Sequence, residues 1–188
     1  MTLEEYRQLF TKILEGRYTQ TPYDNPSFHN YVKLNQSRMK RWTKQASISQ
    51  ELGNLLKRIE IPQHWIIITE PWCGDAANII PFLEKMAAIS PKIEVRVQLR
   101  DSNSEIDNYL TNGGRSIPIL IARDNQGQDL FVWGPRPAPA QALVMAQKES
   151  PLPQEEKYAA VLQWYKEDNG ETLQAEIGAL LIPMLVDL

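Results

Sequence analysis

Cysteine and histidine are scarce in this chain, which contains one cysteine, Cys73, and two histidines, His29 and His64. A single cysteine excludes an intrachain disulfide, and these three residues are too few for a structural zinc site. The sequence also lacks a glycine-rich phosphate loop, a clear pair of catalytic carboxylates and a Ser/His/Asp arrangement. Any covalent redox chemistry must therefore use one thiol, and we expect neither a metal nor a bound cofactor.

Long apolar runs are absent as well. No stretch of 18 apolar residues exists, so we expect no membrane partner. The first 14 residues include Glu4 and Glu5 and have neither a basic segment nor an apolar core, which argues against a secretory signal. The expectation is a cytoplasmic protein with a reduced thiol.

The residues that are present have the composition of a globular protein. Of the 188 residues, 43% are hydrophobic and 23% are charged, and the formal net charge is −3. This composition provides enough apolar material for a core and excludes wholesale disorder. The length suits one domain with extensions or two small domains.

Charge is unevenly distributed along the chain. Residues 26–50 contain five basic residues and no acid, whereas residues 149–188 have a net charge of −6. The segment Arg38-Met39-Lys40-Arg41-Trp42 is compatible with a nucleic-acid surface, but the chain as a whole is acidic and no nucleic-acid-binding motif accompanies it. We therefore expect no nucleic-acid partner, and expect these charges to be solvated or to face the acidic C-terminal segment.

The order of the expected elements is that of a layered α/β protein. Hydrophobic periodicity predicts a helix in residues 3–14, ended by Gly16, and a helical region over residues 28–59 that is interrupted near 47–50. Strands are predicted at 64–69, 93–99, 117–122 and 130–133, with helices at 73–89, 101–112 and 140–148. The chain is helical again from residue 154, with a break at Gly170. This order predicts a mixed sheet flanked by helices, with helical extensions at both ends.

The C-terminal extension carries an apolar stripe at helical spacing. Its members are Leu173, Ile177, Leu180, Leu181, Met184, Leu185 and Leu188. Such a stripe must be covered. Packing on the same subunit is one interpretation, and a homodimer interface is the other.

Cys73 is the residue whose position in the sequence most favours reactivity. It follows a buried strand by a few residues and begins a helix, where unpaired backbone N–H groups and the helix dipole favour a thiolate. The alternative interpretation is a small buried hydrophobic residue.

The segment Trp72-Cys73-Gly74-Asp75-Ala76 resembles the active-site segment of the thioredoxin superfamily, whose usual form is Trp-Cys-Gly-Pro-Cys. Further features match in order along the chain: Pro81, Asp101, the dipeptide Ile117-Pro118 and Gly134. The resemblance implies a thioredoxin-like domain over residues 62–149, between extensions at 1–61 and 150–188. It also implies that Pro118 follows a cis peptide bond and that Cys73 is the nucleophile.

This resemblance departs from the family pattern at three positions. Ala76 replaces the resolving cysteine, so a dithiol cycle cannot run within one chain. The resemblance implies a proton relay formed by an aspartate and a lysine, and Ile67 and Val97 stand at these two positions. The residues that remain resemble those of monothiol members, which exchange with glutathione, here a co-substrate, or with a client protein thiol.

The neighbours of Cys73 leave the sign of its pKa shift open. Asp75 suits a helix N-terminus but opposes a thiolate, and Glu70 adds to that opposition. Arg115 either lies on the same rim and offsets both charges or is a solvated loop residue.

Two functions compete at this point. In the first, Cys73 performs monothiol exchange, and Trp72, Gly74, Asp75, Arg115, Ile117 and Pro118 form the substrate site. In the second, the chain is a noncatalytic binding module that keeps the fold. The second function is favoured by Ala76, Ile67 and Val97, and the first is favoured by Cys73 at a helix start.

Overall fold

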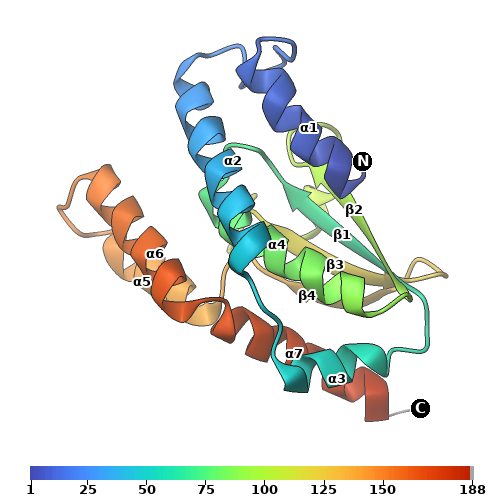
Figure 1. The fold of residues 1–188 in the computed structure, drawn as a ribbon. Coiled ribbons are helices and arrows are strands. Elements are labelled where there is room, and N and C mark those ends of the chain that lie inside the picture. Colours follow the sequence, from blue (N-terminus) through green and yellow to red (C-terminus); the bar gives the residue numbers. More distant parts are fainter. Residues whose placement is uncertain (187–188) are drawn as a thin grey trace.

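The computed structural model describes residues 1–186 and contains a four-stranded sheet surrounded by helices (Figure 1). The strands are β1 (Gln63–Thr69), β2 (Ile93–Leu99), β3 (Ile119–Asp124) and β4 (Asp129–Trp133). The helices are α1 (Leu3–Leu14), α2 (Ser27–Gln45), α3 (Gln50–Lys57), α4 (Gly74–Ile89), α5 (Ala138–Gln147), α6 (Gln154–Asp168) and α7 (Glu171–Val186). The predicted mixed sheet flanked by helices is confirmed.

The sheet has the strand order β2-β1-β3-β4. β1 pairs with β2 in parallel and with β3 in antiparallel, and β3 and β4 form the predicted hairpin. The central strand β1 has only one residue that is not buried, which explains its nearly continuous run of apolar residues. In β2, Val97 and Leu99 are buried while Gln98 between them is not, as the alternating sequence predicts.

Local signals in the sequence set several helix ends. The Thr2 hydroxyl accepts a hydrogen bond from the Glu5 N–H, and the Glu5 carboxylate accepts one from the Thr2 N–H, which together cap α1. Gly16 has a positive φ of 69° directly after this helix, as expected of its terminator. The interruption near residues 47–50 is confirmed, because Ser49 caps the separate helix α3.

The predicted helix at residues 101–112 is wrong. This segment contains only a short 3-10 helix, Ile106–Asn108. Asn103 and Asn112 adopt left-handed conformations, with φ of 56° and 51°, which an α-helix does not accommodate. Glu105 is instead held by side chains of the sheet, accepting hydrogen bonds from Gln98 and Arg123.

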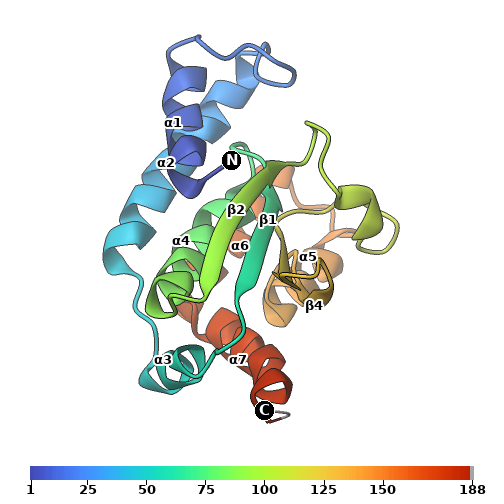
Figure 2. The same cartoon turned by 90° about the vertical axis from the view of Figure 1, so that its right-hand side faces the viewer.

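Both terminal segments pack on the sheet and its helices. The backbone of Met1 pairs with Val97, so the start of the chain lies beside β2 (Figure 2). Helix α2 packs on α4, and α7 packs on α3 and β4. The apolar stripe of α7 buries Leu173, Ile177, Leu181 and Leu185, each contributing roughly 1.5–3 kcal/mol relative to exposure. Leu188, expected in this stripe, lies outside the described residues.

Candidate functional site

Cys73 is the N-cap residue of α4, directly after the loop that leaves β1. Its sulfur accepts a hydrogen bond from the Ala76 N–H at 3.5 Å, and its thiol donates to the Ile117 carbonyl at 3.4 Å. Only 5% of the residue is exposed. The thiol is therefore held between a helix start and a neighbouring loop, on a wall of the cavity described below.

The Ile117–Pro118 peptide bond is cis and lies directly before β3. Gly134, after β4, packs tightly against it. A Cβ atom at position 134 would lie 2.4 Å from the Pro118 carbonyl oxygen, and the φ of Gly134 is 129°. Only glycine combines that conformation with that close approach.

Burial raises the pKa of the Cys73 thiol to about 12, and the negative charge of Asp75 adds to this effect. The Ala76 N–H and the Arg136 guanidinium act in the opposite direction, but their contributions are smaller. The sequence left the direction of the Cys73 pKa shift open. The structure gives a raised pKa, because desolvation outweighs the effect of the helix N-terminus. At neutral pH the sulfur is a thiol.

Asp75 is buried beside Cys73, and two partners contact its carboxyl group. Its carboxylate accepts a hydrogen bond from the Tyr165 hydroxyl at 2.9 Å and lies 2.7 Å from the Arg136 guanidinium. Burial raises the pKa of Asp75, and Arg136 and Tyr165 offset this increase only in part. Sequence reasoning missed both partners, because neither lies near Asp75 in the chain.

Arg115 lies on the rim of the site but pairs with Asp107, at 3.0 Å. It is thus Arg136, and not Arg115, that faces the charge of Asp75. Glu70 is also buried, accepting hydrogen bonds from the Tyr23 hydroxyl at 2.5 Å and from the Asp101 N–H at 3.0 Å. Burial raises the pKa of Glu70 as well.

The two positions of the missing proton relay meet in the sheet. Ile67 in β1 and Val97 in β2 are direct partners in the strand register, and at most 1% of each is exposed. Apolar side chains therefore occupy both places, and neither can carry a proton beneath α4.

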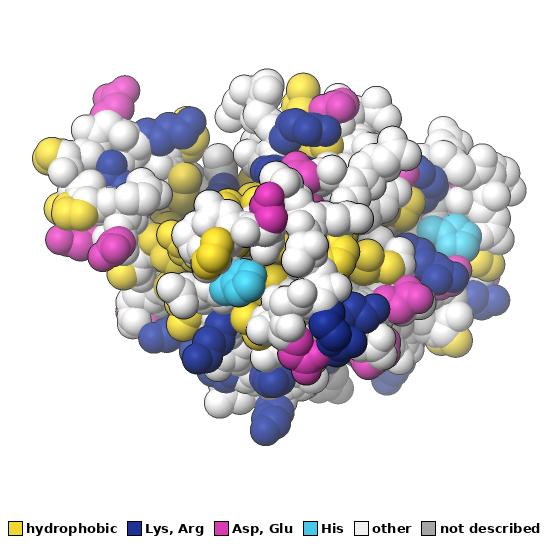
Figure 3. Space-filling model, turned by 90° about the horizontal axis from the view of Figure 1, so that it is seen from above, with side chains coloured by type: hydrophobic (Ala, Val, Ile, Leu, Met, Phe, Trp, Pro, Cys, Tyr) yellow, Lys and Arg dark blue, Asp and Glu magenta, His cyan; other side chains and the backbone are white. Residues whose placement is uncertain are grey.

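A cavity of about 680 Å³ lies beside Cys73 and Asp75. Seen from above, the molecule is hollowed between the α5–α6 hairpin and the rest of the chain, with hydrophobic side chains inside the hollow (Figure 3). Of the sequence-predicted site residues, the cavity is lined by Trp72, Cys73, Gly74, Asp75, Arg115 and Ile117, whereas Pro118 is not part of its lining. The sequence missed the wall contributed by Phe28, Tyr31, Arg100, Arg136, Lys148, Lys157 and Tyr158.

Tyr158 of α6 covers the start of α4. A Cβ atom at position 74 would lie 1.8 Å from the Tyr158 hydroxyl oxygen, so only glycine fits there without displacing this ring. Arg38 of α2 also contacts Tyr158. It donates a hydrogen bond to the Tyr158 hydroxyl at 3.2 Å, and its guanidinium carbon lies 5.6 Å from the ring centre. The C-terminal extension is thus part of the site.

Trp72 forms an aromatic part of the wall. Its ring meets Phe28 edge to face, with the centres 6.4 Å apart, and Arg100 lies 4.8 Å from the indole centre. Arg100 is at the same time paired with Asp101 at 2.8 Å. The indole N–H is buried and has no acceptor within residues 1–186.

Residues 1–186 contain no group of three or more His, Cys, Asp or Glu side chains placed to hold a metal ion. In the same part of the chain, no helix is long and apolar enough to cross a membrane.

A family model described as thioredoxin matches residues 22–157. The chain belongs to the thioredoxin family. The match includes Cys73, the Ile117-Pro118 segment (the cis-proline loop) and the start of α6. No match was found among curated proteins.

Two solved structures share this thioredoxin fold. A protein of unknown function from Pseudomonas aeruginosa aligns with a TM-score of 0.59 and 18% identity, covering 82% of this chain and 90% of its own. An HIV epitope scaffold aligns with a TM-score of 0.57 and 18% identity, at the same coverage. At this identity the likeness concerns the fold alone.

Proposed function

We propose that this member of the thioredoxin family is a binding module, in which the cavity beside Cys73 holds a ligand and the thiol is a buried structural group. The environment of Cys73 carries the proposal. The residue is 5% exposed, its thiol donates to the Ile117 carbonyl, and burial together with Asp75 raises its pKa to about 12. A protonated thiol is a poor nucleophile, so the site is better suited to binding than to exchange.

The surroundings of the thiol support the same proposal. Ala76 provides no resolving sulfur, and the apolar pair Ile67 and Val97 provides no base. The cavity, in contrast, has the volume of a small-molecule site. A lone thiol also suits a reducing compartment, and we place the protein in the cytoplasm on that ground.

The experiment is alkylation of the native protein with iodoacetamide at pH 8, followed by mass spectrometry, beside the same reaction in denaturant. A rise in pKa from 9 to about 12 lowers the thiolate fraction roughly a thousandfold, so we expect native alkylation to be slower by a factor of that order. Cys73→Ser is the matched control, because it removes the only thiol. Alkylation at similar rates in both states would refute the proposal.

Monothiol exchange is the second candidate, and it is favoured by the position of Cys73 on the cavity wall beside the Ile117 carbonyl. In this reaction the Cys73 thiolate attacks glutathione disulfide, forms a mixed disulfide and releases one glutathione thiolate. The thiolate of a second glutathione or of a client protein then attacks the glutathione sulfur of this mixed disulfide. It forms a new disulfide with that glutathione and releases Cys73 as a thiolate, which takes up a proton. A mass increase of one glutathione on the native protein at pH 8 would favour this function over the binding module.

A further inference from the structure

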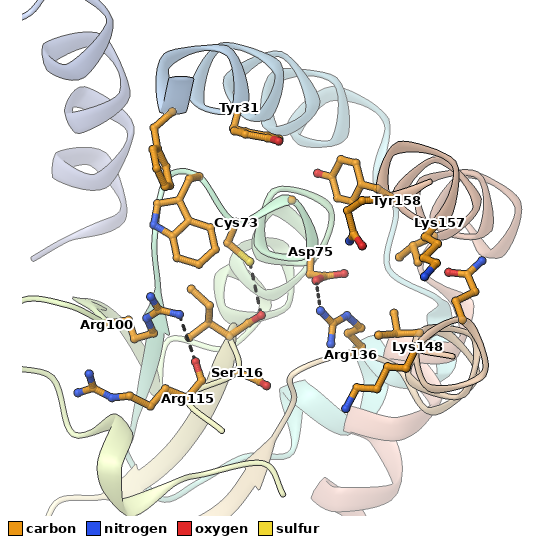
Figure 4. A pocket seen from close by; sticks show the side chains of 18 residues that line it. Tyr31, Cys73, Asp75, Arg100, Arg115, Ser116, Arg136, Lys148, Lys157 and Tyr158 are labelled. Carbon is orange, nitrogen blue, oxygen red and sulfur yellow. Dashed lines mark hydrogen bonds and ion pairs between the residues drawn. The ribbon is translucent and has the colours of Figure 1, made fainter. Parts of the chain in front are cut away.

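The far wall of the cavity belongs to the C-terminal helices. Whereas α4 and the cis-proline loop contribute Cys73 and Ile117, helices α5 and α6 contribute Val144, Tyr158 and Val161. Figure 4 shows Arg136, Lys148, Lys157 and Tyr158 on one side of Cys73, with Arg100 and Arg115 on the other. Two sides of the cavity are thus formed by different parts of the chain.

Basic side chains outnumber acidic ones in this lining. Five basic side chains line the cavity, and Asp75 is the one acidic residue among the lining residues. The three arginines are each neutralised by an acid. Their pairs are Arg100 with Asp101, Arg115 with Asp107, and Arg136 with Asp75.

The two lysines differ from the arginines in this respect. Lys148 is the C-cap residue of α5, and Lys157 lies in the first turns of α6. Within residues 1–186 neither ammonium group forms a hydrogen bond or an ion pair. Glu155 and Glu156 belong to the same helix, but they are exposed and do not line the cavity. The cavity therefore has a net positive side supplied by Lys148 and Lys157.

The opposite part of the wall is aromatic. Phe28 packs edge to face on both Trp72 and Tyr31, with each pair of ring centres 6.4 Å apart. Tyr31 remains 50% exposed, so part of this cluster is open to a ligand. Flat apolar groups are favoured by such a surface.

We propose that the cavity binds a small aromatic molecule that carries one acidic group. Its rings lie against Phe28, Tyr31 and Trp72, and its acidic group faces Lys148 and Lys157. The proposal rests on the proposed function, namely that this cavity is a ligand site, and the volume of about 680 Å³ suits such a molecule.

The test compares two fluorescent probes with nearly the same rings. One is 8-anilinonaphthalene-1-sulfonate, which carries an acidic group, and the other is N-phenyl-1-naphthylamine, which has none. We expect the anionic probe to bind about tenfold more tightly, and the preference to weaken as salt screens the lysines. In the double variant Lys148→Gln with Lys157→Gln, the preference should disappear.

Two further variants locate the bound probe. Lys166→Gln removes an exposed charge from α6, the helix of Lys157, at a position outside the cavity lining. This variant should keep the preference for the anionic probe. Phe28→Ala removes one ring from the aromatic wall and should weaken the binding of both probes by a similar factor. Circular dichroism checks that each variant is folded.

Equal affinity for the two probes, or no binding of the anionic probe, would overturn the proposal. So would a preference that survives the double lysine variant, or probe affinities that Phe28→Ala leaves unchanged. The alkylation experiment tests the proposed function separately. Rapid alkylation of native Cys73 together with a retained probe preference would refute the proposed function but not the assignment of the ligand class.

Discussion

The guanidinium of Arg136 lies 2.7 Å from the carboxylate of Asp75, joining the segment after β4 to the first turn of α4. This pair lies next to the only thiol of the chain, and its two members act on that thiol in opposite directions. The charge of Asp75 raises the pKa of Cys73, whereas Arg136 lowers it. The reactivity of Cys73 therefore depends on a contact between distant parts of the sequence.

Asp75→Asn should make Cys73 more reactive. The substitution removes a negative charge beside the thiol and leaves the positive charge of Arg136, so the pKa of Cys73 falls below about 12. Because burial is the larger cause of the shift, the pKa should stay above the ordinary value. Below the pKa, the alkylation rate should rise about tenfold for each unit by which the pKa falls, and the curve against pH should move to lower pH.

The control is Asp24→Asn, which removes an exposed charge outside the cavity lining. It should leave the alkylation rate of Cys73 unchanged. A rate that Asp75→Asn also leaves unchanged would show that the charge of Asp75 does not reach the thiol.

Ala76→Cys should create an internal disulfide. The Ala76 N–H already contacts the Cys73 sulfur at 3.5 Å, so a second sulfur would start from the same helical turn. Under mild oxidation we expect the loss of both thiols, measured by mass spectrometry after alkylation. Turnover with a disulfide substrate should nevertheless be slow, because Ile67 and Val97 supply no proton relay.

Adding Ile67→Asp to Ala76→Cys tests the second half of this prediction. If the relay is what limits turnover, the combined variant should reduce a disulfide substrate faster than Ala76→Cys alone. The unfolding midpoint of both variants must be measured, since a carboxyl group in place of buried Ile67 also costs stability. Fast turnover by Ala76→Cys alone would contradict the prediction.

Gly74→Ala should be destabilising only while Tyr158 is present. The added Cβ would lie 1.8 Å from the Tyr158 hydroxyl oxygen, and we expect a loss of about 1–3 kcal/mol in urea unfolding as the ring is displaced. In a Tyr158→Ala background the same substitution should cost close to nothing. Equal costs in the two backgrounds would mean that α6 does not cover the start of α4.

Gly170→Ala should be among the more damaging glycine substitutions. Gly170 has a φ of 78°, and an added Cβ would lie 2.3 Å from the buried ring of Phe82. The strained backbone and the clash together should lower the free energy of unfolding by about 2–4 kcal/mol. Gly16→Ala is the control, because its φ of 69° is similar but no atom lies within 4 Å.

The control should lose only about 1 kcal/mol, the cost of the backbone conformation alone. Similar losses for the two variants would indicate that the Phe82 ring moves aside freely. Both can be measured by urea unfolding at neutral pH.

Local pattern determined most of the fold. The apolar run of β1, the alternation in β2 and the glycine after α1 each specify structure within a few residues, because strand burial and helix termination depend on neighbouring side chains. The ordered motif around Cys73 was sufficient to identify the thioredoxin family. The segment 101–112 was predicted wrongly, since two left-handed asparagines and the contacts of Glu105 with the sheet override its helical pattern.

The tertiary structure decided the chemistry of the site. Cys73 and Asp75 are two positions apart in sequence, but the partners of Asp75, Arg136 and Tyr165, come from distant segments. The same holds for Lys148 and Lys157, which no sequence pattern places in one cavity. Desolvation and long-range charge contacts depend on the packed chain, and no local pattern encodes them.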